Sequence, residues 1–394
     1  MSSAVDRFTR AGFAVNVSLS VAEALRKKAG ELRAIVRQTE KLQNELHRHG
    51  LWKFQVEGAA WLRSRSKAIL GDQMGLGKTV QALCALPDRP AALVICPASL
   101  KFNWRHEVTQ WRPELLPVVL SGRGSFRFPA RGEVVIVNYD ILPDLPALEA
   151  AVVPQGVSLI ADELHYVKNR KVRKDGTAGR GAKFGWLAKK IRDHGGSTWG
   201  LTGTPLVNRW EELYALLAQM DLQKETFGTK KACELMFTFN RAKVPLALRS
   251  AMLRRTREQV LPDLPTKIYQ EFDVVDFDKA AKREADLLVG LLESRNLSLD
   301  GGWMKDAESA AQFVRARKAL ATAKIPALDA LLDQYEEDDP DNPVVVFSAH
   351  RAPVDHAGLR PGWATITGDC TPEQRQETVT KFQRGELKGL ALTI

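Results

Sequence analysis

Two short segments carry side chains that could bind a phosphate chain and a metal ion. Lys78 and Thr79 close a glycine-containing turn, and Asp162 and Glu163 follow an apolar run further along the chain. A lysine ammonium can reach the β- and γ-phosphates of a nucleotide, and a neighbouring hydroxyl can hold Mg²⁺. Asp162 could bind the same ion, usually through water, while Glu163 could orient or deprotonate an attacking water. These residue types predict hydrolysis of a nucleoside triphosphate.

The first segment is predicted to be a phosphate-binding loop between a buried strand and a helix. The apolar run 68–71 precedes it, and the helical pattern 80–86 follows it. Glycines let backbone N–H groups approach a polyphosphate closely, and the helix N-terminus adds partial positive charge. The expected nucleotide-binding residues are Asp72, Met74, Gly75, Leu76, Gly77, Lys78 and Thr79. Because Asp72 stands where the strict pattern has glycine, the segment alone also fits an ordinary strand-to-helix turn.

The two carboxylates and a third segment depend on this context. Alone, an Asp-Glu pair is nearly always a solvated surface feature. Behind the buried-strand pattern 159–161, and downstream of a phosphate loop, Asp162 and Glu163 are better explained as a functional pair. The third segment, 199–205, again runs from apolar residues into a small polar turn, and by itself it fits a simple Gly-Pro turn.

Residues 46–265 alternate between strand-like and helix-like patterns. We expect strands near 67–71, 92–96, 133–137, 157–161 and 198–201. We expect helices near 77–86, 99–110, 140–150, 182–194 and 209–219. This alternation predicts an α/β fold in which helices cover both faces of a parallel sheet. The phosphate loop and the carboxylates then fall at the carboxyl ends of strands, where such sheets bind ligands.

The flanking parts of the chain have other patterns. Residues 1–45 read as basic helices, most simply a docking or bracing pair. Residues 266–275 predict an extended strand, and 276–337 predict helices that either protrude or merely link. From residue 343 the strand-helix alternation resumes, and Thr371 is expected to cap a helix whose first residue is Pro372.

Composition places the chain among soluble globular proteins with ample core. It has 394 residues, of which 44% are hydrophobic and 26% charged, so two or three domains are expected. The four cysteines are scattered without a Cys-x-x-Cys pair, which argues against a zinc site or a disulfide framework. No apolar stretch approaches the roughly 20 residues of a membrane span, so we expect a cytoplasmic protein, or a nuclear one in a eukaryote.

A net charge of +10 favours a polyanionic partner. The densest basic cluster runs from Lys168 to Arg192 and includes a glycine-rich stretch. It fits either a solvated surface or a grip on the phosphate backbone, which carries no sequence information. The residues expected to make that grip are Lys171, Arg173, Lys174 and Arg180.

Together, and in this order, the three segments resemble motifs I, II and III of the Swi/Snf-type branch of the superfamily-two helicase-like ATPases. That branch also has Asp at the position of Asp72. The segment 51–58 resembles its adenine-reading motif, with Gln55 as the contact, and Asp162-Glu163-Leu164-His165 is close to the annealing-helicase (HARP-like) form. Further segments that resemble the branch lie at 96–107, 138–140, 253–265, 347–350 and 366–382.

The resemblance implies a P-loop NTPase with a RecA-like sheet. Residues 46–265 would form a complete first lobe and 343–394 part of a second, joined by a strand and helical linker at 266–342. The helical segment at 1–45, predicted from its own pattern, precedes the region of resemblance. ATP and Mg²⁺ would bind the first lobe, with Thr79 and Asp162 on the ion. Thr202, Gly203 and Thr204 would couple the nucleotide state to DNA.

The resemblance also implies an ATP-dependent DNA translocase that remodels duplex or branched DNA without reading its sequence. The sequence ends before the family's motifs V and VI, so we expect a truncated chain, or a second chain that supplies their arginines. Without those arginines the chain could instead be an ATP-binding DNA clamp or a catalytically weak remnant. A further alternative is the translocase subunit of a restriction or phage-defence system.

Overall fold

The computed structural model describes residues 50–393, except 123, 169–177, 205–208, 266 and most of 274–306. The chain divides into two compact units after Leu264. Among the described residues, no helix combines the length and the apolar character needed to cross a membrane.

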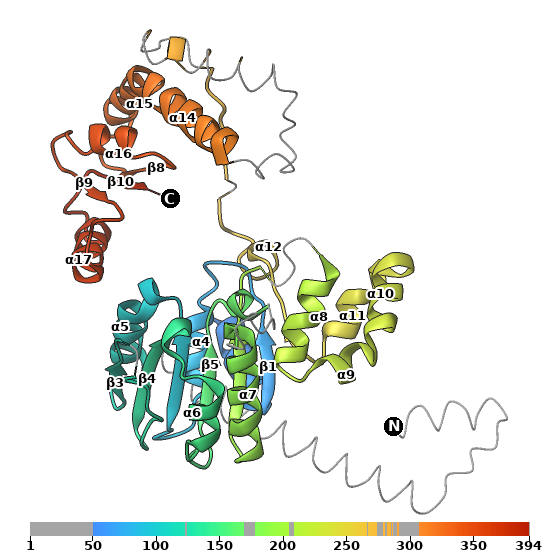
Figure 1. Cartoon of the computed structure of the whole chain (residues 1–394). Coiled ribbons are helices and arrows are strands. Elements are labelled where there is room, and N and C mark those ends of the chain that lie inside the picture. Colours follow the sequence, from blue (N-terminus) through green and yellow to red (C-terminus); the bar gives the residue numbers. More distant parts are fainter. Residues whose placement is uncertain are drawn as a thin grey trace, which may run out of the picture. The chain divides into compact units, whose positions relative to one another are not determined.

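The first unit is built on a seven-stranded sheet in which every pairing is parallel (Figure 1). The strand order is β3-β4-β2-β5-β6-β1-β7. The strands are β1 (Lys67–Leu70), β2 (Ala92–Cys96), β3 (Leu116–Val119), β4 (Glu133–Asn138), β5 (Ser158–Ala161), β6 (Ser197–Leu201) and β7 (Met252–Leu253). The central strands are buried along almost their whole length, as expected for a parallel sheet covered on both faces.

Helices cover both faces of this sheet, and each face has its own apolar core. One core takes side chains from α3 (Lys53–Arg63), α4 (Lys78–Ala85) and α5 (Lys101–Trp111). The other takes side chains from α6 (Leu145–Ala150), α7 (Arg180–Asp193) and α8 (Trp210–Gln219). The other α-helices in the described part of this unit are α9 (Gln223–Phe227), α10 (Lys230–Phe239), α11 (Val244–Leu248) and α12 (Arg257–Val260). Cys84 and Cys96 lie in the core, as their apolar surroundings predict.

The α/β class predicted from the sequence, with helices around a parallel sheet, is confirmed, and all five expected strands form. Two edge strands were not expected. β3 contains Pro117 and is half-exposed, and β7 has only two residues, so neither shows the long apolar pattern of a buried strand.

The second unit contains a three-stranded parallel sheet in the order β8-β10-β9. Its strands are β8 (Val344–Ser348), β9 (Trp363–Ile366) and β10 (Gly389–Thr393). Its described helices are α14 (Ala307–Ala323), α15 (Ile325–Asp338), α16 (Arg351–Ala357) and α17 (Pro372–Gln383). The predicted cap of α17 is confirmed, because the Thr371 hydroxyl accepts a hydrogen bond from the Gln374 N–H at 3.2 Å.

The strand expected over 266–275 is wrong for the residues that are described. Residues 267–273 form neither helix nor strand, and Ile268 and Tyr269 are 84% and 86% exposed. An extended segment becomes a strand only when it pairs with a neighbour, and β-propensity reflects that packing more than the backbone itself.

Candidate nucleotide-binding site

The loop between β1 and α4 has the backbone shape that its glycines allow. Gly75 and Gly77 have φ values of +85° and +70°, in the left-handed region that suits glycine. Gly77 is the N-cap of α4, whose first residues are Lys78 and Thr79. The loop therefore ends at a helix N-terminus, where unpaired N–H groups can bind an anion.

Glycines also allow neighbouring side chains to approach the loop closely. A Cβ atom on Gly77 would lie 2.5 Å from Gln55 Nε2. A Cβ atom on Gly203 would lie 2.8 Å from Met74 Cγ and 3.6 Å from Lys78 Nζ. Gln55, from the segment that resembles an adenine-reading motif, thus lies against the loop, and so does the segment after β6.

The Lys78 ammonium lies among carboxylates from distant parts of the sequence. Its Nζ donates hydrogen bonds to the carbonyl oxygens of Asp72 at 3.0 Å and Gln73 at 3.4 Å. Burial lowers the pKa of Lys78, while the negative charges of Glu163, Asp162 and Asp72 oppose that shift. The fold has therefore brought the lysine of the first segment near the carboxylates of the second.

Asp162 follows β5; its N–H donates to the Ile95 carbonyl at 2.8 Å, and its oxygen atoms accept three hydrogen bonds. The Trp104 indole Nε1 donates to its Oδ2 at 2.8 Å, and the Glu163 N–H donates to its Oδ1 at 2.9 Å. The Tyr139 hydroxyl donates to its carbonyl oxygen at 2.6 Å. Burial raises the pKa of Asp162, and the Trp104 hydrogen bond partly offsets this by stabilising the carboxylate.

Glu163 has an uncommon backbone conformation, with φ +50° and ψ +55°. A residue other than glycine in this region stores strain of about 1 kcal/mol or more, and such residues cluster at functional sites. Its Oε2 is buried and has no hydrogen-bond partner among the described residues. His165 Nδ1 is 3.1 Å from that oxygen, but the two atoms lack hydrogen-bond geometry. A carboxylate oxygen is thus left able to accept a proton or a hydrogen bond.

The third segment lies beside the first two because β6 is the strand between β5 and β1. Thr202 is fully buried, and its N–H donates to the Leu70 carbonyl at 3.1 Å. Its hydroxyl accepts from the Thr204 N–H at 3.2 Å. Three segments that are far apart in the sequence therefore share one edge of the sheet.

Of the residues expected to grip DNA, Lys171, Arg173 and Lys174 lie outside the described residues. Arg180 begins α7, and its Nε donates to Asp140 Oδ1 at 2.7 Å. The Arg180 guanidinium also lies 5.6 Å from the centroid of the Tyr166 ring. The charge of Arg180 is thus partly neutralised by Asp140, which weakens its attraction for a phosphate.

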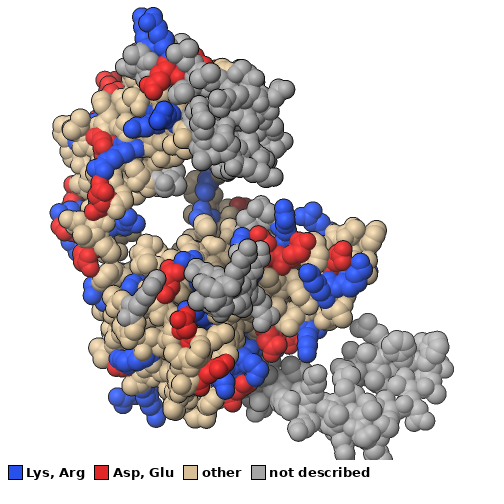
Figure 2. All heavy atoms as spheres, in the orientation of Figure 1, with Lys and Arg blue, Asp and Glu red and all other residues tan. Residues whose placement is uncertain are grey.

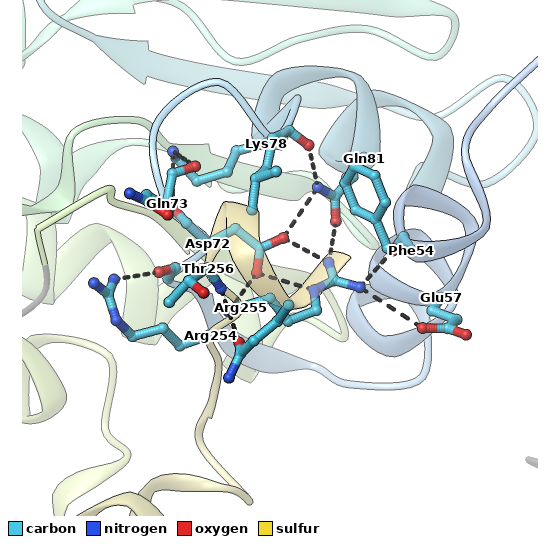
Figure 3. Close-up of polar contacts among 12 residues, drawn as sticks. Phe54, Glu57, Asp72, Gln73, Lys78, Gln81, Arg254, Arg255 and Thr256 are labelled. Carbon is cyan, nitrogen blue, oxygen red and sulfur yellow. Dashed lines mark hydrogen bonds and ion pairs between the residues drawn. The ribbon is translucent and has the colours of Figure 1, made fainter. Parts of the chain in front are cut away.

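Several residues around the loop could not be assigned from the motifs. Figure 3 shows the Asp72 carboxylate facing the Arg255 guanidinium and the Gln81 amide. Asp72 is 0% exposed, so its carboxylate points into the protein. The signals in the sequence were Asp72, a charged residue where the general phosphate-loop pattern has glycine, and the family resemblance of the segment 253–265, which contains Arg255.

Comparison with known proteins places this arrangement in a family. Residues 54–283 match the family described as SNF2-related domain. The chain is 27% identical over 377 residues to SWI/SNF-related matrix-associated actin-dependent regulator of chromatin subfamily A-like protein 1 of Xenopus tropicalis, covering 87% of this chain and 37% of that protein. It is 30% identical over 260 residues to the DNA annealing helicase and endonuclease ZRANB3 of Mus musculus, covering 59% and 23%.

The chain thus spans well under half the length of these curated relatives. A solved structure titled Sulfolobus solfataricus SWI2/SNF2 ATPase core in complex with dsDNA aligns with a TM-score of 0.44 and 19% identity, covering 87% of this chain and 78% of that one. The family model matches more than half of the chain, which confirms the resemblance seen in the motifs. The chain belongs to the SNF2-related domain family.

Proposed function

We propose that this chain is an ATP-dependent motor acting on DNA, and that duplex or branched DNA stimulates its ATP hydrolysis. The observation that carries the proposal is the meeting of Lys78, Asp162 and Glu163 at one edge of the sheet, with a buried Glu163 oxygen that lacks a hydrogen-bond partner among the described residues. A relative named as a DNA annealing helicase supports DNA as the partner. Because DNA is the partner, the chain would work in the cytoplasm, or in the nucleus of a eukaryote.

The residues fit Mg²⁺ and ATP as cofactors. The Thr79 hydroxyl and the Asp162 carboxylate offer oxygen ligands, which Mg²⁺ prefers. Substrate phosphates usually supply further ligands to the same ion. When bound, Mg²⁺ would neutralise part of the phosphate charge. The Glu163 oxygen that lacks a hydrogen-bond partner in the described part of the chain fits a carboxylate that accepts a hydrogen bond from water.

Each residue of the candidate site would have a distinct task in the reaction. Lys78 and the N–H groups of the loop would bind the phosphates, while Gln55 would contact the adenine. Glu163 would orient the attacking water and take its proton. Thr202 and Thr204, linked by their hydrogen bond beside the loop, would couple the nucleotide state to the grip on DNA. All these residues belong to the segment 46–265, which we assign as the first lobe. We assign 266–342 as a linker and 343–394 as part of a second lobe.

The test is steady-state ATP hydrolysis by the 394-residue chain, with and without duplex DNA. A motor should show turnover that rises when DNA is added. ATP binding without turnover in either condition would contradict the motor and favour an ATP-binding DNA clamp.

Replacing Trp104 with phenylalanine should raise the Mg²⁺ concentration needed for half-maximal hydrolysis by about threefold to tenfold. The indole hydrogen bond holds the Asp162 carboxylate in place, and losing a hydrogen bond to a charged group removes about 1.5–3 kcal/mol, only part of which falls on metal binding. The measurement is a Mg²⁺ titration of ATPase rate at fixed ATP.

Trp199→Phe is the matched control for this titration. Trp199 is also buried, and its indole donates to the Arg65 carbonyl at 2.9 Å, away from Asp162. Equal Mg²⁺ requirements in the two variants would show that Trp104 merely packs.

Replacing Lys171, Arg173 and Lys174 together with alanine should weaken DNA binding and flatten its salt dependence. Each phosphate contact contributes about 0.9 to the slope of log affinity against log salt, so the slope should fall by at most about three. The measurement is DNA affinity at several salt concentrations. An unchanged slope would mean that these side chains form only a solvated surface.

A further inference from the structure

The phosphate loop contains a fully buried charge. The Asp72 carboxylate is 0% exposed, and it belongs to the loop that would bind a polyanion. An isolated buried carboxylate is strongly unfavourable, and it would also repel phosphates. A compensating cation must therefore accompany it.

Arg255, which directly follows β7 and Arg254, supplies that cation (Figure 3). Its Nε donates to Asp72 Oδ1 at 3.1 Å, and its Nη2 donates to Asp72 Oδ2 at 2.5 Å. The Arg255 N–H adds a bond to Oδ1 at 3.0 Å, and Gln81 Nε2 adds one to Oδ2 at 3.2 Å. Nε and Nη2 thus bind the two oxygens of one carboxylate, which is the bidentate geometry of a strong arginine–carboxylate pair.

The same guanidinium joins the two helices beside the loop. Its Nη1 donates to the Phe54 carbonyl of α3 at 2.5 Å, and its Nη2 donates to Gln81 Oε1 of α4 at 2.9 Å. A Cβ atom on Gly58 would lie 1.8 Å from Gln81 Oε1 and 2.7 Å from Arg255 Nη2. Glycine inside a helix costs about 1 kcal/mol relative to alanine, and here it makes room for this network.

The main chain around Arg255 stays hydrogen-bonded to the phosphate loop beyond the end of the sheet. The Gly71 N–H donates to the Leu253 carbonyl at 2.7 Å, and the Gln73 N–H donates to the Arg255 carbonyl at 3.0 Å. Gln73 Oε1 accepts from the Arg257 N–H at 2.7 Å. The first residues of the loop are therefore hydrogen-bonded to the segment 253–257.

We propose that Arg255 is a positioning residue for nucleotide binding, acting through Asp72 and Gln81 rather than by touching the nucleotide. Its N–H groups already bind protein oxygens, and Gln81 in turn donates to the Leu76 carbonyl at 2.9 Å. The Asp72 and Gln73 carbonyls that accept from Lys78 belong to the residues held in this way. The inference rests on the proposed nucleotide site, and it makes Asp72 a second positioning residue.

The experiment is a fluorescence titration of the full chain with mant-ADP and Mg²⁺. Arg255→Lys should raise the Kd about tenfold or more, because lysine keeps the charge but cannot form the fork. Arg112→Lys is the matched control: the two arginine side chains are 11% and 12% exposed. Arg112 donates to the Leu83 and Leu86 carbonyls at the other end of α4. Arg112→Lys should therefore have a lower Tm, while its Kd for mant-ADP should stay within about twofold of the unaltered chain.

The pair can also be tested as a unit. Asp72→Asn should raise the Kd as well, and the double variant with Arg255→Lys should be no weaker than the weaker single variant, because residues in one network are not additive. If Arg255→Lys does not fold, Asp72→Asn alone decides, and an unchanged Kd overturns the inference. Additive effects, or a folded Arg255→Lys with unchanged Kd, also overturn it.

Lys78→Ala separates this inference from the proposed function. Loss of mant-ADP binding in Lys78→Ala but not in Arg255→Lys would overturn only the positioning role. Unchanged binding in Lys78→Ala, or no binding by the unaltered chain, would overturn the nucleotide site itself.

Discussion

Replacing Lys78 with alanine should lower ATP hydrolysis by about a hundredfold to a thousandfold, the range measured when one charge-stabilising donor is removed from an active site. Lys78 is the lysine that the fold places near Asp162 and Glu163, and its Nζ donates to the loop carbonyls of Asp72 and Gln73. Without it, the carboxylates and the phosphates would lose the positive charge that Lys78 places between them. The measurement is steady-state turnover, with circular dichroism to show that the fold is intact.

Lys67→Ala is the control for that experiment. Lys67 is also a half-buried lysine, but it begins β1, at the end of the strand away from the loop. Its Nζ lies 3.6 Å from Asp221 and 3.5 Å from Glu225. Its loss should leave turnover nearly unchanged. Equal turnover in Lys78→Ala and the unaltered chain would remove the phosphate-loop assignment.

Local patterns were enough to predict the architecture of the first unit. Buried parallel strands are continuous apolar runs, so the five strands β1, β2, β4, β5 and β6 could be located from the sequence pattern alone. The same reasoning predicted that the loop after β1 and the carboxylates after β5 share an edge, because parallel strands end on the same side. The capping of α17 by Thr371 was likewise a local signal.

What could not be predicted depends on contacts between segments far apart in the sequence. Arg255 and Asp72 are 183 positions apart, and no spacing rule connects them. The same holds for Trp104 and Asp162, since an indole inside a helix normally indicates packing, not a hydrogen bond to a buried carboxylate. The contact of Arg180 with DNA stays a prediction, and its pairing with Asp140 is a further contact that sequence spacing could not show.

Replacing Glu163 with glutamine should lower ATP hydrolysis by about a hundredfold to ten-thousandfold while nucleotide binding persists. Glutamine has nearly the same shape but cannot take a proton from water. The buried Glu163 oxygen lies 3.1 Å from His165 Nδ1 but has no hydrogen-bond partner among the described residues, so no hydrogen bond to that atom is lost. The measurements are single-turnover hydrolysis and the Kd for mant-ADP.

Glu212→Gln is a close control, because the two glutamate side chains are 26% and 25% exposed. Glu212 also has a buried Oε2 without a hydrogen-bond partner in the described part of the chain, but its Oε1 pairs with Lys168 at 2.9 Å. Equal slowing by both variants would mean that loss of a buried charge, and not of a base, causes the effect. Slowing confined to Glu163→Gln, with an unchanged Kd, would assign the proton transfer to Glu163. Loss of mant-ADP binding in Glu163→Gln would contradict that role, because a general base acts on the attacking water and contributes little to holding the nucleotide.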